Sequence, residues 1–585
     1  MISLKKFPLS ILALTCSTLF VVGCSVDDKV TSGKQDSPQI TTEVTKQKKS
    51  EAKITSQPVQ EQDAIMEKEL SFSQMAPAPR LGTNITTGMN RPLKATGGYM
   101  QPSIYVPENR ENYLAFEENS VIQVAEKPIS TFSIDVDTAA YSNIRRFLMQ
   151  GQLPPKDAVK TEELINYFAY QYPVPNSLDT PFSITTEIAP SPWNNNKHLL
   201  HIGIKGYDID KEDIPASNLV FLVDVSGSMR NISKLGLVKQ SLKLLLKQLD
   251  KDDMVSLVVY AGAAGVILEP TSASESVKIE QAIDNLTAGG STNGEAGIIE
   301  AYAMAQKGYI ENGINRVIIA SDGDMNVGRF KLNELKELIE QKRKSGIALT
   351  TLGFGSGNYN YALMEQLADV GNGNAAYIDN LLEAQKVLVN EMSSTLLTIA
   401  KDVKIQIEFS PQVKEYRLIG YENRLLKRED FNNDKVDAGE IGAGHTITAL
   451  YEITLAGENG SVDPLRYRHD NKQGQDQSFA DELAYLKIRY KQPNEDTSRL
   501  ISQAIKVKQI LPRLENSSTR FQFSASVAAF GQQLKGGKFL GNYGHQEIIQ
   551  LARHSRGEDK HGYRAEFIKL VELAKNLSPE KIVQH

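Results

Sequence analysis

Three short stretches of the sequence bring together side chains that carry hydroxyl or carboxylate oxygens. The oxygen donors are Asp224, Ser226 and Ser228 in the first stretch, Thr292 in the second and Asp322 in the third. Such oxygens are hard ligands, and Mg²⁺ takes octahedral oxygen coordination in which several positions stay with water or an incoming ligand. The five residues therefore predict a magnesium site, at which Mn²⁺ or Ca²⁺ could take the place of Mg²⁺.

The surrounding elements alternate in a way that would bring these stretches together. From Asn218 onward, short β-branched runs alternate with amphipathic helical patterns, which is typical of a parallel sheet covered by helices on both faces. Strands are expected at residues 219–223, 255–260, 317–320 and 348–352, and helices at residues 235–247, 277–286, 295–309, 332–344, 361–370 and 382–397. This is a doubly wound, Rossmann-like α/β fold, in which ligands lie beyond the carboxyl ends of the strands.

The three stretches also resemble the loops of a known domain. Asp224-Val225-Ser226-Gly227-Ser228 is the D-x-S-x-S motif of the von Willebrand factor type A (vWA) domain, and the stretches around Thr292 and Asp322 resemble its threonine and final aspartate loops. The resemblance covers residues 216–400. It implies a metal-ion-dependent adhesion site (MIDAS), in which the two serines and Thr292 bind the metal directly and the two aspartates act through water. An acidic residue of a protein partner would complete the coordination.

Two alternatives for these residues stay open. Asp224 and the serines could cap the following helix without binding a metal, because short polar side chains at a helix start accept backbone hydrogen bonds. Asp324 and Asn326 are nearby oxygen-bearing residues that could replace one of the five, although their position favours an ordinary loop role.

The N-terminus has the pattern of an export signal. In residues 1–23, Lys5 and Lys6 precede an apolar stretch at residues 7–20 that is too short and too interrupted for a membrane span. The signal ends in Val21-Val22-Gly23-Cys24, which resembles the lipobox of bacterial lipoproteins. We therefore expect acylation of Cys24 and a lipid anchor in the bacterial cell envelope.

The residues after Cys24 bear on where the anchor holds the protein. Ser25 follows the cysteine, whereas Asp at that position retains lipoproteins of this kind in the inner membrane, so the expected location is the outer membrane, facing the periplasm. Residues 24–98 are rich in Ser, Thr, Gln and Lys with few aromatic residues, a composition that predicts a disordered tether.

The segment before the vWA region, residues 99–215, is predicted to contain helices and strands. Its residues 130–143 and 162–168 resemble the N-terminal flanking region of bacterial vWA lipoproteins. A strand is expected at residues 132–136, helices from residue 138 and at residues 161–170, and further strands at residues 182–188 and 199–204. Asp135 and Asp137 could form a second cation site or a catalytic carboxylate pair, although a structural role is favoured.

Two further regions follow the vWA region. Residues 401–492 alternate like antiparallel strands at residues 403–409, 413–419, 446–453 and 482–490, and they are expected to form a β-sandwich with strands from before the vWA region. Residues 493–585 are expected to be helical, with helices at residues 496–510, 520–534, 545–554 and 563–575. Residues 521–531 and 561–567 resemble the C-terminal region of the same lipoprotein family.

Composition and missing motifs narrow the function. Lys and Arg number 65 against 71 Asp and Glu, with no polybasic run, so nucleic-acid binding finds no support. The sequence has no G-x-S-x-G elbow and no H-E-x-x-H zinc motif. We therefore expect a non-enzymatic protein that binds a protein partner through its MIDAS. A metal-independent envelope scaffold is the first alternative, and a metal-dependent hydrolase at Asp224 and Asp322 is the second.

Overall fold

The computed structural model describes residues 110–323, 325, 332–463 and 479–579. All of them belong to one compact unit, residues 101–585. The expected signal, Cys24 and the whole of the expected tether lie outside the described residues, as do Asp324 and Asn326. Among the helices that the structure describes, none is both long and apolar enough to cross a membrane.

The vWA segment forms a six-stranded sheet in the order β10-β9-β8-β5-β6-β7. Its strands are β5 (Ser217–Asp224), β6 (Met254–Tyr260), β7 (Ala264–Ser272), β8 (Ile314–Ser321), β9 (Ala348–Phe354) and β10 (Ala375–Ile378). All pairs are parallel except β6 with β7, which is antiparallel. Every residue of β5 and β8 is buried, as expected for central strands with helices on both faces.

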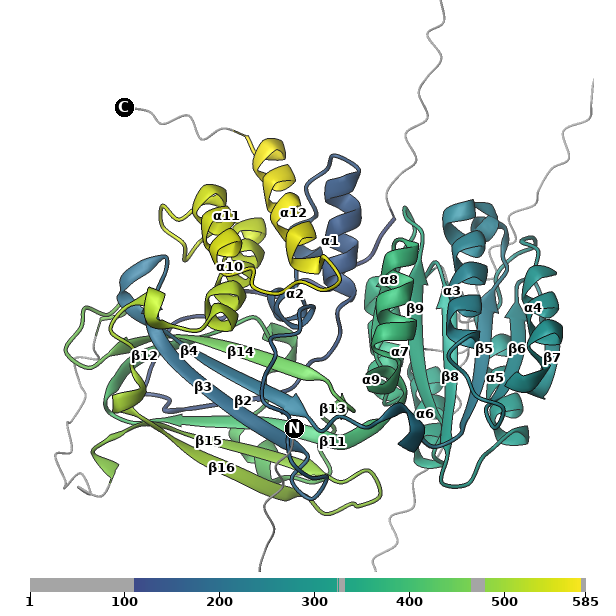
Figure 1. The fold of residues 1–585 in the computed structure, drawn as a ribbon, viewed down its shortest axis with the longest axis horizontal. Coiled ribbons are helices and arrows are strands. Elements are labelled where there is room, and N and C mark those ends of the chain that lie inside the picture. The colour runs from purple at the N-terminus through teal and green to yellow at the C-terminus, as the bar shows by residue number, and fades with distance from the viewer. Residues whose placement is uncertain (1–109, 324, 326–331, 464–478, 580–585) are drawn as a thin grey trace, which may run out of the picture. The chain divides into compact units, whose positions relative to one another are not determined.

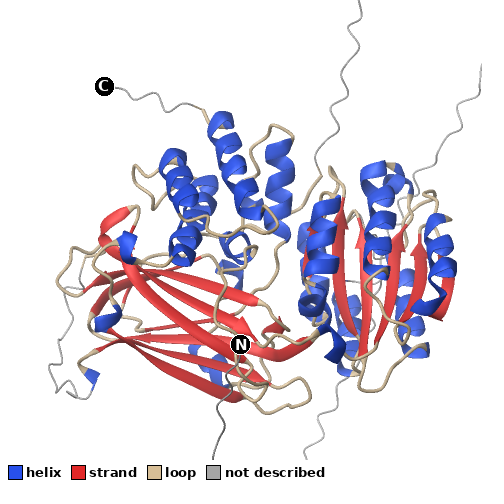
Figure 2. Ribbon diagram, viewed as in Figure 1, coloured by secondary structure: helices blue, strands red, loops and turns tan. Residues whose placement is uncertain are grey.

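Helices cover both faces of this sheet (Figures 1 and 2). They are η4 (Ile232–Gly236), α3 (Leu237–Leu246), α4 (Ser276–Asp284), α5 (Gly294–Lys307), α6 (Leu332–Lys344), α7 (Tyr361–Val370), α8 (Leu381–Gln385), η6 (Lys386–Asn390) and α9 (Met392–Leu396). Phe221 and its neighbours on one face pack with α3, α4 and α8, whereas Leu222 on the other face packs with α5, α6 and α7. The predicted doubly wound α/β fold is confirmed.

Two further sheets form a β-sandwich from strands on both sides of the vWA segment. One sheet has the order β1-β12-β14-β4-β3, and the other has β13-β11-β15-β16 with β2 also paired to β11. The strands are β1 (Ile122–Gln123), β2 (Ile129–Ser133), β3 (Phe182–Ser191), β4 (Asn194–Gly206), β11 (Thr398–Phe409), β12 (Val413–Ile419), β13 (Gly439–Gly442), β14 (Thr446–Leu455), β15 (Glu482–Lys491) and β16 (Arg499–Lys506). Ile202 from one sheet and Ile405 from the other belong to the same buried core.

Helices from the two ends of the described chain share another core. They are α1 (Ala139–Met149), α2 (Thr161–Asn166), α10 (Thr519–Lys535), α11 (His545–His554) and α12 (Tyr563–Leu577). The ring of Phe168 packs edge to face on those of Phe523 and Phe567, at centroid distances of 5.1 and 5.6 Å. Such geometry is favoured between aromatic rings and ties the N-terminal flank to the C-terminal helices.

Two expectations for the flanking regions are wrong. The helix predicted at residues 496–510 is instead strand β16, because Leu500, Ile501 and Ile505 suit a helical stripe but the segment pairs with β15 at the edge of its sheet. The strand expected at residues 132–136 ends at Ser133, so Asp135 and Asp137 follow the strand instead of alternating within it. Strands β7 and β10 were not located from the sequence, since one contains Gly and Pro and the other has four residues.

Candidate metal centre

The two aspartates of the predicted site lie at the ends of neighbouring parallel strands. Asp224 is the last residue of β5, and Asp322 directly follows the last residue of β8. The two strands pair in register, with Val223 opposite Ala320. Because parallel strands end at the same edge of a sheet, both carboxylates are placed there, and both are fully buried.

Backbone hydrogen bonds shape the loop after β5. The backbone N–H of Ser226 donates to Asp224 Oδ1 at 2.8 Å, and that of Met229 donates to the carbonyl of Ser226 at 3.1 Å. This turn brings the hydroxyl oxygens of Ser226 and Ser228 to 2.9 Å from each other. The loop therefore presents two hydroxyls beside Asp224, with Ser226 buried and Ser228 exposed.

The loop that carries Thr292 is fastened to the loop after β5. The N–H of Gly289 donates to the carbonyl of Val225 at 2.7 Å, and the N–H of Gly227 donates to the carbonyl of Gly290 at 3.0 Å. Gly290 has a φ of +86°, which a residue with a side chain rarely adopts. These bonds hold the half-buried Thr292 in the same set of loops as the serines.

Asp224 is oriented by hydroxyl groups and strongly desolvated. Its Oδ2 accepts hydrogen bonds from Ser321 at 3.1 Å and from Tyr260 at 3.3 Å. Burial raises the pKa of Asp224 to about 6, which leaves the carboxylate mostly ionised at neutral pH.

Asp322 has an ammonium group as its neighbour. Burial acts to raise the pKa of Asp322, but Lys234, whose Nζ lies 2.8 Å from Oδ2, and the hydroxyl of Ser228 together bring that pKa below its ordinary value. Lys234 was not among the predicted site residues, because a lysine just before a helix is usually a solvated surface residue. Nothing in its spacing indicated that it would be buried.

The residues fit a hard divalent cation. Four of the five predicted residues, Asp224, Ser226, Ser228 and Asp322, are joined through direct contacts, and the loop of Thr292 is bonded to theirs. All of their donor atoms are oxygens, which is the chemistry that Mg²⁺, Mn²⁺ and Ca²⁺ prefer. A buried pair of carboxylates at a sheet edge also needs positive charge nearby, and a metal would add to that of Lys234.

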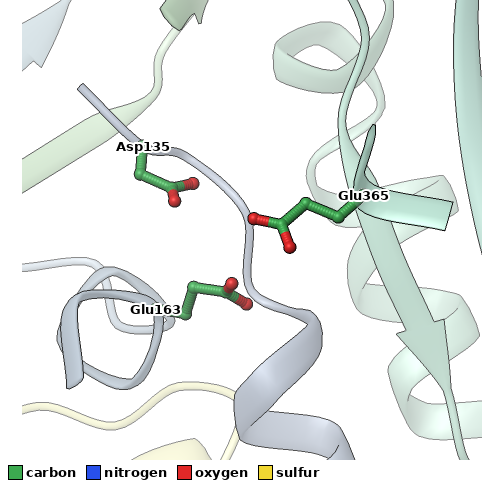
Figure 3. A group of neighbouring side chains, drawn as sticks. All are labelled: Asp135, Glu163 and Glu365. Carbon is green, nitrogen blue, oxygen red and sulfur yellow. The ribbon is translucent and has the colours of Figure 1, made fainter. Parts of the chain in front are cut away.

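A second acidic cluster lies where the N-terminal flank meets the vWA domain. The carboxylates of Asp135, Glu163 and Glu365 point toward one another (Figure 3), and one oxygen of each lies within 4.8 Å of the others. All three are buried. Arg424 Nε lies 2.9 Å from Asp135, and Lys160 Nζ lies 3.2 Å from Glu163 and also pairs with Glu365. The protein thus supplies cations to this cluster, which supports a structural role for Asp135.

The fold and the three loops at the sheet edge together define a vWA-containing protein, and comparisons with protein families agree. Residues 218–391 match the von Willebrand factor type A domain, residues 107–201 match a family described as von Willebrand factor, and residues 394–577 match the family "Uncharacterized protein YfbK, C-terminal". The chain is 50% identical over 469 residues to Uncharacterized protein YfbK of Escherichia coli (strain K12), a match that covers 79% of this chain and 80% of that protein. The chain therefore belongs to the YfbK family.

Other matches have lower sequence identity and cover smaller parts of the chain. Inter-alpha-trypsin inhibitor heavy chain H3 of Homo sapiens is 25% identical over 255 residues, which is 41% of this chain and 28% of the heavy chain. A solved structure described as von Willebrand factor type A from Catenulispora acidiphila is 12% identical and has a TM-score of 0.40, covering 69% of this chain and 91% of its own. The ArnB paralog VWA2 from Sulfolobus acidocaldarius is 16% identical with a TM-score of 0.33, covering 68% and 98%.

Proposed function

We propose that this protein is a non-enzymatic adhesion protein of the bacterial cell envelope that binds a protein partner through a divalent metal ion. Domains of the vWA family mediate protein–protein interactions, and the chain carries such a domain at residues 218–391. The observation that carries the proposal is the meeting of two buried carboxylates and two adjacent hydroxyls at the carboxyl edge of the sheet.

Each residue of the site has a defined part in this function. Ser226, Ser228 and Thr292 would offer neutral oxygens to the metal, and Asp224 and Asp322 would balance its charge. The bound metal supplies an electrophilic position that a Glu or Asp of the partner can occupy. Neutral direct ligands leave the metal electron-poor, so the site favours an anionic group from outside.

The environment of Asp224 argues against the hydrolase alternative. A general base needs a free lone pair within reach of the attacking water. Three of the roughly four acceptor positions of the Asp224 carboxylate are already used, because Oδ1 accepts the N–H of Ser226 and Oδ2 accepts the hydroxyls of Tyr260 and Ser321. Asp322 is ion-paired with Lys234, an arrangement that suits charge balance better than proton transfer.

Envelope anchoring belongs to the same proposal. Acylation of Cys24 would hold the protein to the outer membrane, since each buried methylene contributes about 0.8 kcal/mol and two or three acyl chains give stable attachment. A tether of the composition of residues 24–98 would let the folded part stand away from the lipid surface.

The test is a capture from envelope extract with the soluble 25–585 form, each time in Mg²⁺ and in chelator. The wild type is compared with Thr292→Ala, which removes the hydroxyl, and with Thr292→Ser, which keeps it. A partner retained in Mg²⁺ by the wild type and Thr292→Ser, and lost with Thr292→Ala or chelator, supports the adhesion mechanism. Equal recovery under all conditions contradicts it and favours a metal-independent scaffold.

A further inference from the structure

Lys234 places a positive charge inside the candidate metal centre. It belongs to η4, only 8% of it is exposed, and its Nζ lies 2.8 Å from Asp322 Oδ2 and 3.0 Å from the side-chain oxygen of Asn358. Surface lysines keep their ammonium group in water, because removing it from water is unfavourable unless it is paired. This buried ammonium is paired with a predicted metal ligand.

The surrounding backbone is shaped to admit this lysine. Gly355, one residue beyond β9, has a φ of +79°, and a Cβ atom at this glycine would lie 2.4 Å from Cε and 2.5 Å from Cγ of Lys234. At the other end, the side chain of Asn231 accepts the N–H of Ser233 at 3.1 Å and caps η4. The lysine stem therefore lies in a channel that a larger residue at position 355 would close.

The charges at the site can be added up. Asp224 and Asp322 contribute two negative charges and Lys234 one positive charge, which leaves a sum of −1 for these three groups. A divalent cation changes that sum to +1, and one carboxylate from outside then returns it to zero. Without Lys234, the charges of the two aspartates and the metal would already add up to zero.

We propose that Lys234 is a specificity-determining residue that weakens binding of the metal alone and makes metal retention depend on the carboxylate of the partner. This inference rests on the proposed function and says how its site is tuned. The physical cause is repulsion between the ammonium and the divalent cation, which is strong at short range in a partly desolvated site. An incoming carboxylate relieves that repulsion, so the metal and the partner bind cooperatively.

A merely structural ion pair would behave differently. If Lys234 only anchors η4 to Asp322, its removal would loosen the loops and weaken metal binding. If it acts as proposed, its removal strengthens binding of the metal alone. The direction of the change in metal affinity separates the two roles.

The experiment titrates the 25–585 form with Mg²⁺ by calorimetry at pH 8. We expect Lys234→Met to bind Mg²⁺ about tenfold or more tightly than the wild type, and Lys234→Arg to stay close to the wild type. Lys239→Met is the matched control, because Lys239 lies on α3 and its Nζ donates to the carbonyl of Asp284 instead of to a candidate metal-binding residue. This control should leave the affinity unchanged.

The dependence on a carboxylate is tested by repeating the titrations in acetate and in chloride of equal ionic strength. Acetate should raise the Mg²⁺ affinity of the wild type by a larger factor than that of Lys234→Met. Equal factors for the two proteins would overturn the cooperative part of the proposal, and a Lys234→Met variant that binds Mg²⁺ no tighter would overturn the whole of it.

Melting temperatures show whether the variant is folded. Lys234→Met leaves Asp322 without its ammonium partner, so it should melt below the wild type in chelator and recover in Mg²⁺. Lys234→Gln, whose amide can still donate to Asp322, serves if Lys234→Met does not fold, and the same gain in affinity is expected. Absence of Mg²⁺ binding in every protein would contradict the proposed function itself, which distinguishes that failure from the failure of this inference.

Discussion

Arg424 Nε lies 2.9 Å from Asp135 Oδ2, joining two residues that stand 289 positions apart in the chain. The same guanidinium lies 3.1 Å from Asp369 of α7 and 3.6 Å from Asp137. One side chain therefore connects the segment before the vWA domain, the vWA domain and the segment after it. A planar guanidinium suits this position, because it presents several donors in fixed directions.

Replacing Arg424 with Met should destabilise the protein strongly. The change leaves buried carboxylates without their cation, which typically costs about 3–5 kcal/mol. Urea unfolding measures the loss in the free energy of unfolding. Arg499→Met is the control, because Arg499 is 44% exposed in its pair with Glu495 and its removal should change the free energy of unfolding little. Similar losses for the two variants would contradict the role of Arg424 as a junction.

Stability should fall as the pH rises from about 4.5 to about 8. Burial raises the pKa of Glu162 to about 8 and that of Glu163 to about 7. The folded state keeps protons on these groups that the unfolded state releases nearer to pH 4, so ionisation at higher pH favours unfolding. Melting temperatures measured across this pH range give the slope of stability against pH.

Glu162→Gln should reduce that slope, because Glu162 is buried and its Oε2 has no hydrogen-bond partner among the described residues. Glu334→Gln, at an exposed position on α6, is the control and should leave the slope as it is. A Glu162→Gln variant that keeps the full slope would show that Glu162 does not hold a proton in the folded state.

Two buried histidines should oppose this trend on the acidic side. Burial lowers the pKa of both His201 and His445 to about 3. The unfolded state gains their protons near pH 6.5 and the folded state only near pH 3, so their contribution to stability is full above pH 6.5 and is lost as the pH falls toward 3. His201→Gln should weaken the acid dependence, as measured by melts between pH 3 and 6.5. An unchanged acid dependence would count against a neutral His201.

Gly355→Ala should disturb the metal centre more than Gly357→Ala. Both glycines have positive φ values, +79° and +91°, so each substitution introduces backbone strain of about 1 kcal/mol. At Gly355 the new Cβ also collides with the stem of Lys234, whereas a Cβ at Gly357 meets nothing within 4 Å. Melting temperatures should therefore fall further for Gly355→Ala. Equal falls would show that Lys234 moves aside without loss.

Cys24→Ser tests the anchor. The variant cannot be acylated at this position, so we expect it in the soluble envelope fraction while the wild type stays with the outer membrane. Fractionation followed by immunoblotting distinguishes the two. Ser25→Asp is a second comparison, and it should move the lipidated protein to the inner membrane. Membrane association of Cys24→Ser equal to that of the wild type would contradict the proposed anchoring.

The meeting of the candidate metal-binding residues was predictable, because it depends on local sequence and on one topological rule. The turn at Ser226 uses Asp224 two residues earlier, and the meeting of Asp224 with Asp322 follows from two neighbouring parallel strands. Lys234 was not predictable, since its burial depends on a glycine beyond β9 that lies 121 positions later. The pairing of Arg424 with Asp135 depends on contacts between distant segments, which no local pattern reports.

Segments at the centre of a sheet could be predicted from the sequence to be strands, whereas a segment at a sheet edge could not. β5 and β8 are buried along their whole length and read as continuous apolar runs. β16 has mostly exposed or half-buried residues, and its pairing with β15 decides a conformation that its own sequence leaves open between helix and strand.

The β-sandwich is built from strands on both sides of the vWA segment, and this sets the order in which the domains can fold during synthesis. β14 begins at Thr446 and pairs with β4, which ends at Gly206. About 240 further residues must therefore be synthesised after β4 before β14 can cover its free edge. The vWA sheet uses only residues from Ser217 to Ile378, so it can form before β14 is synthesised. Until then β4 presents unpaired backbone groups of the kind that recruit other strands. We therefore expect this edge of β4 to need protection while the vWA domain is emerging.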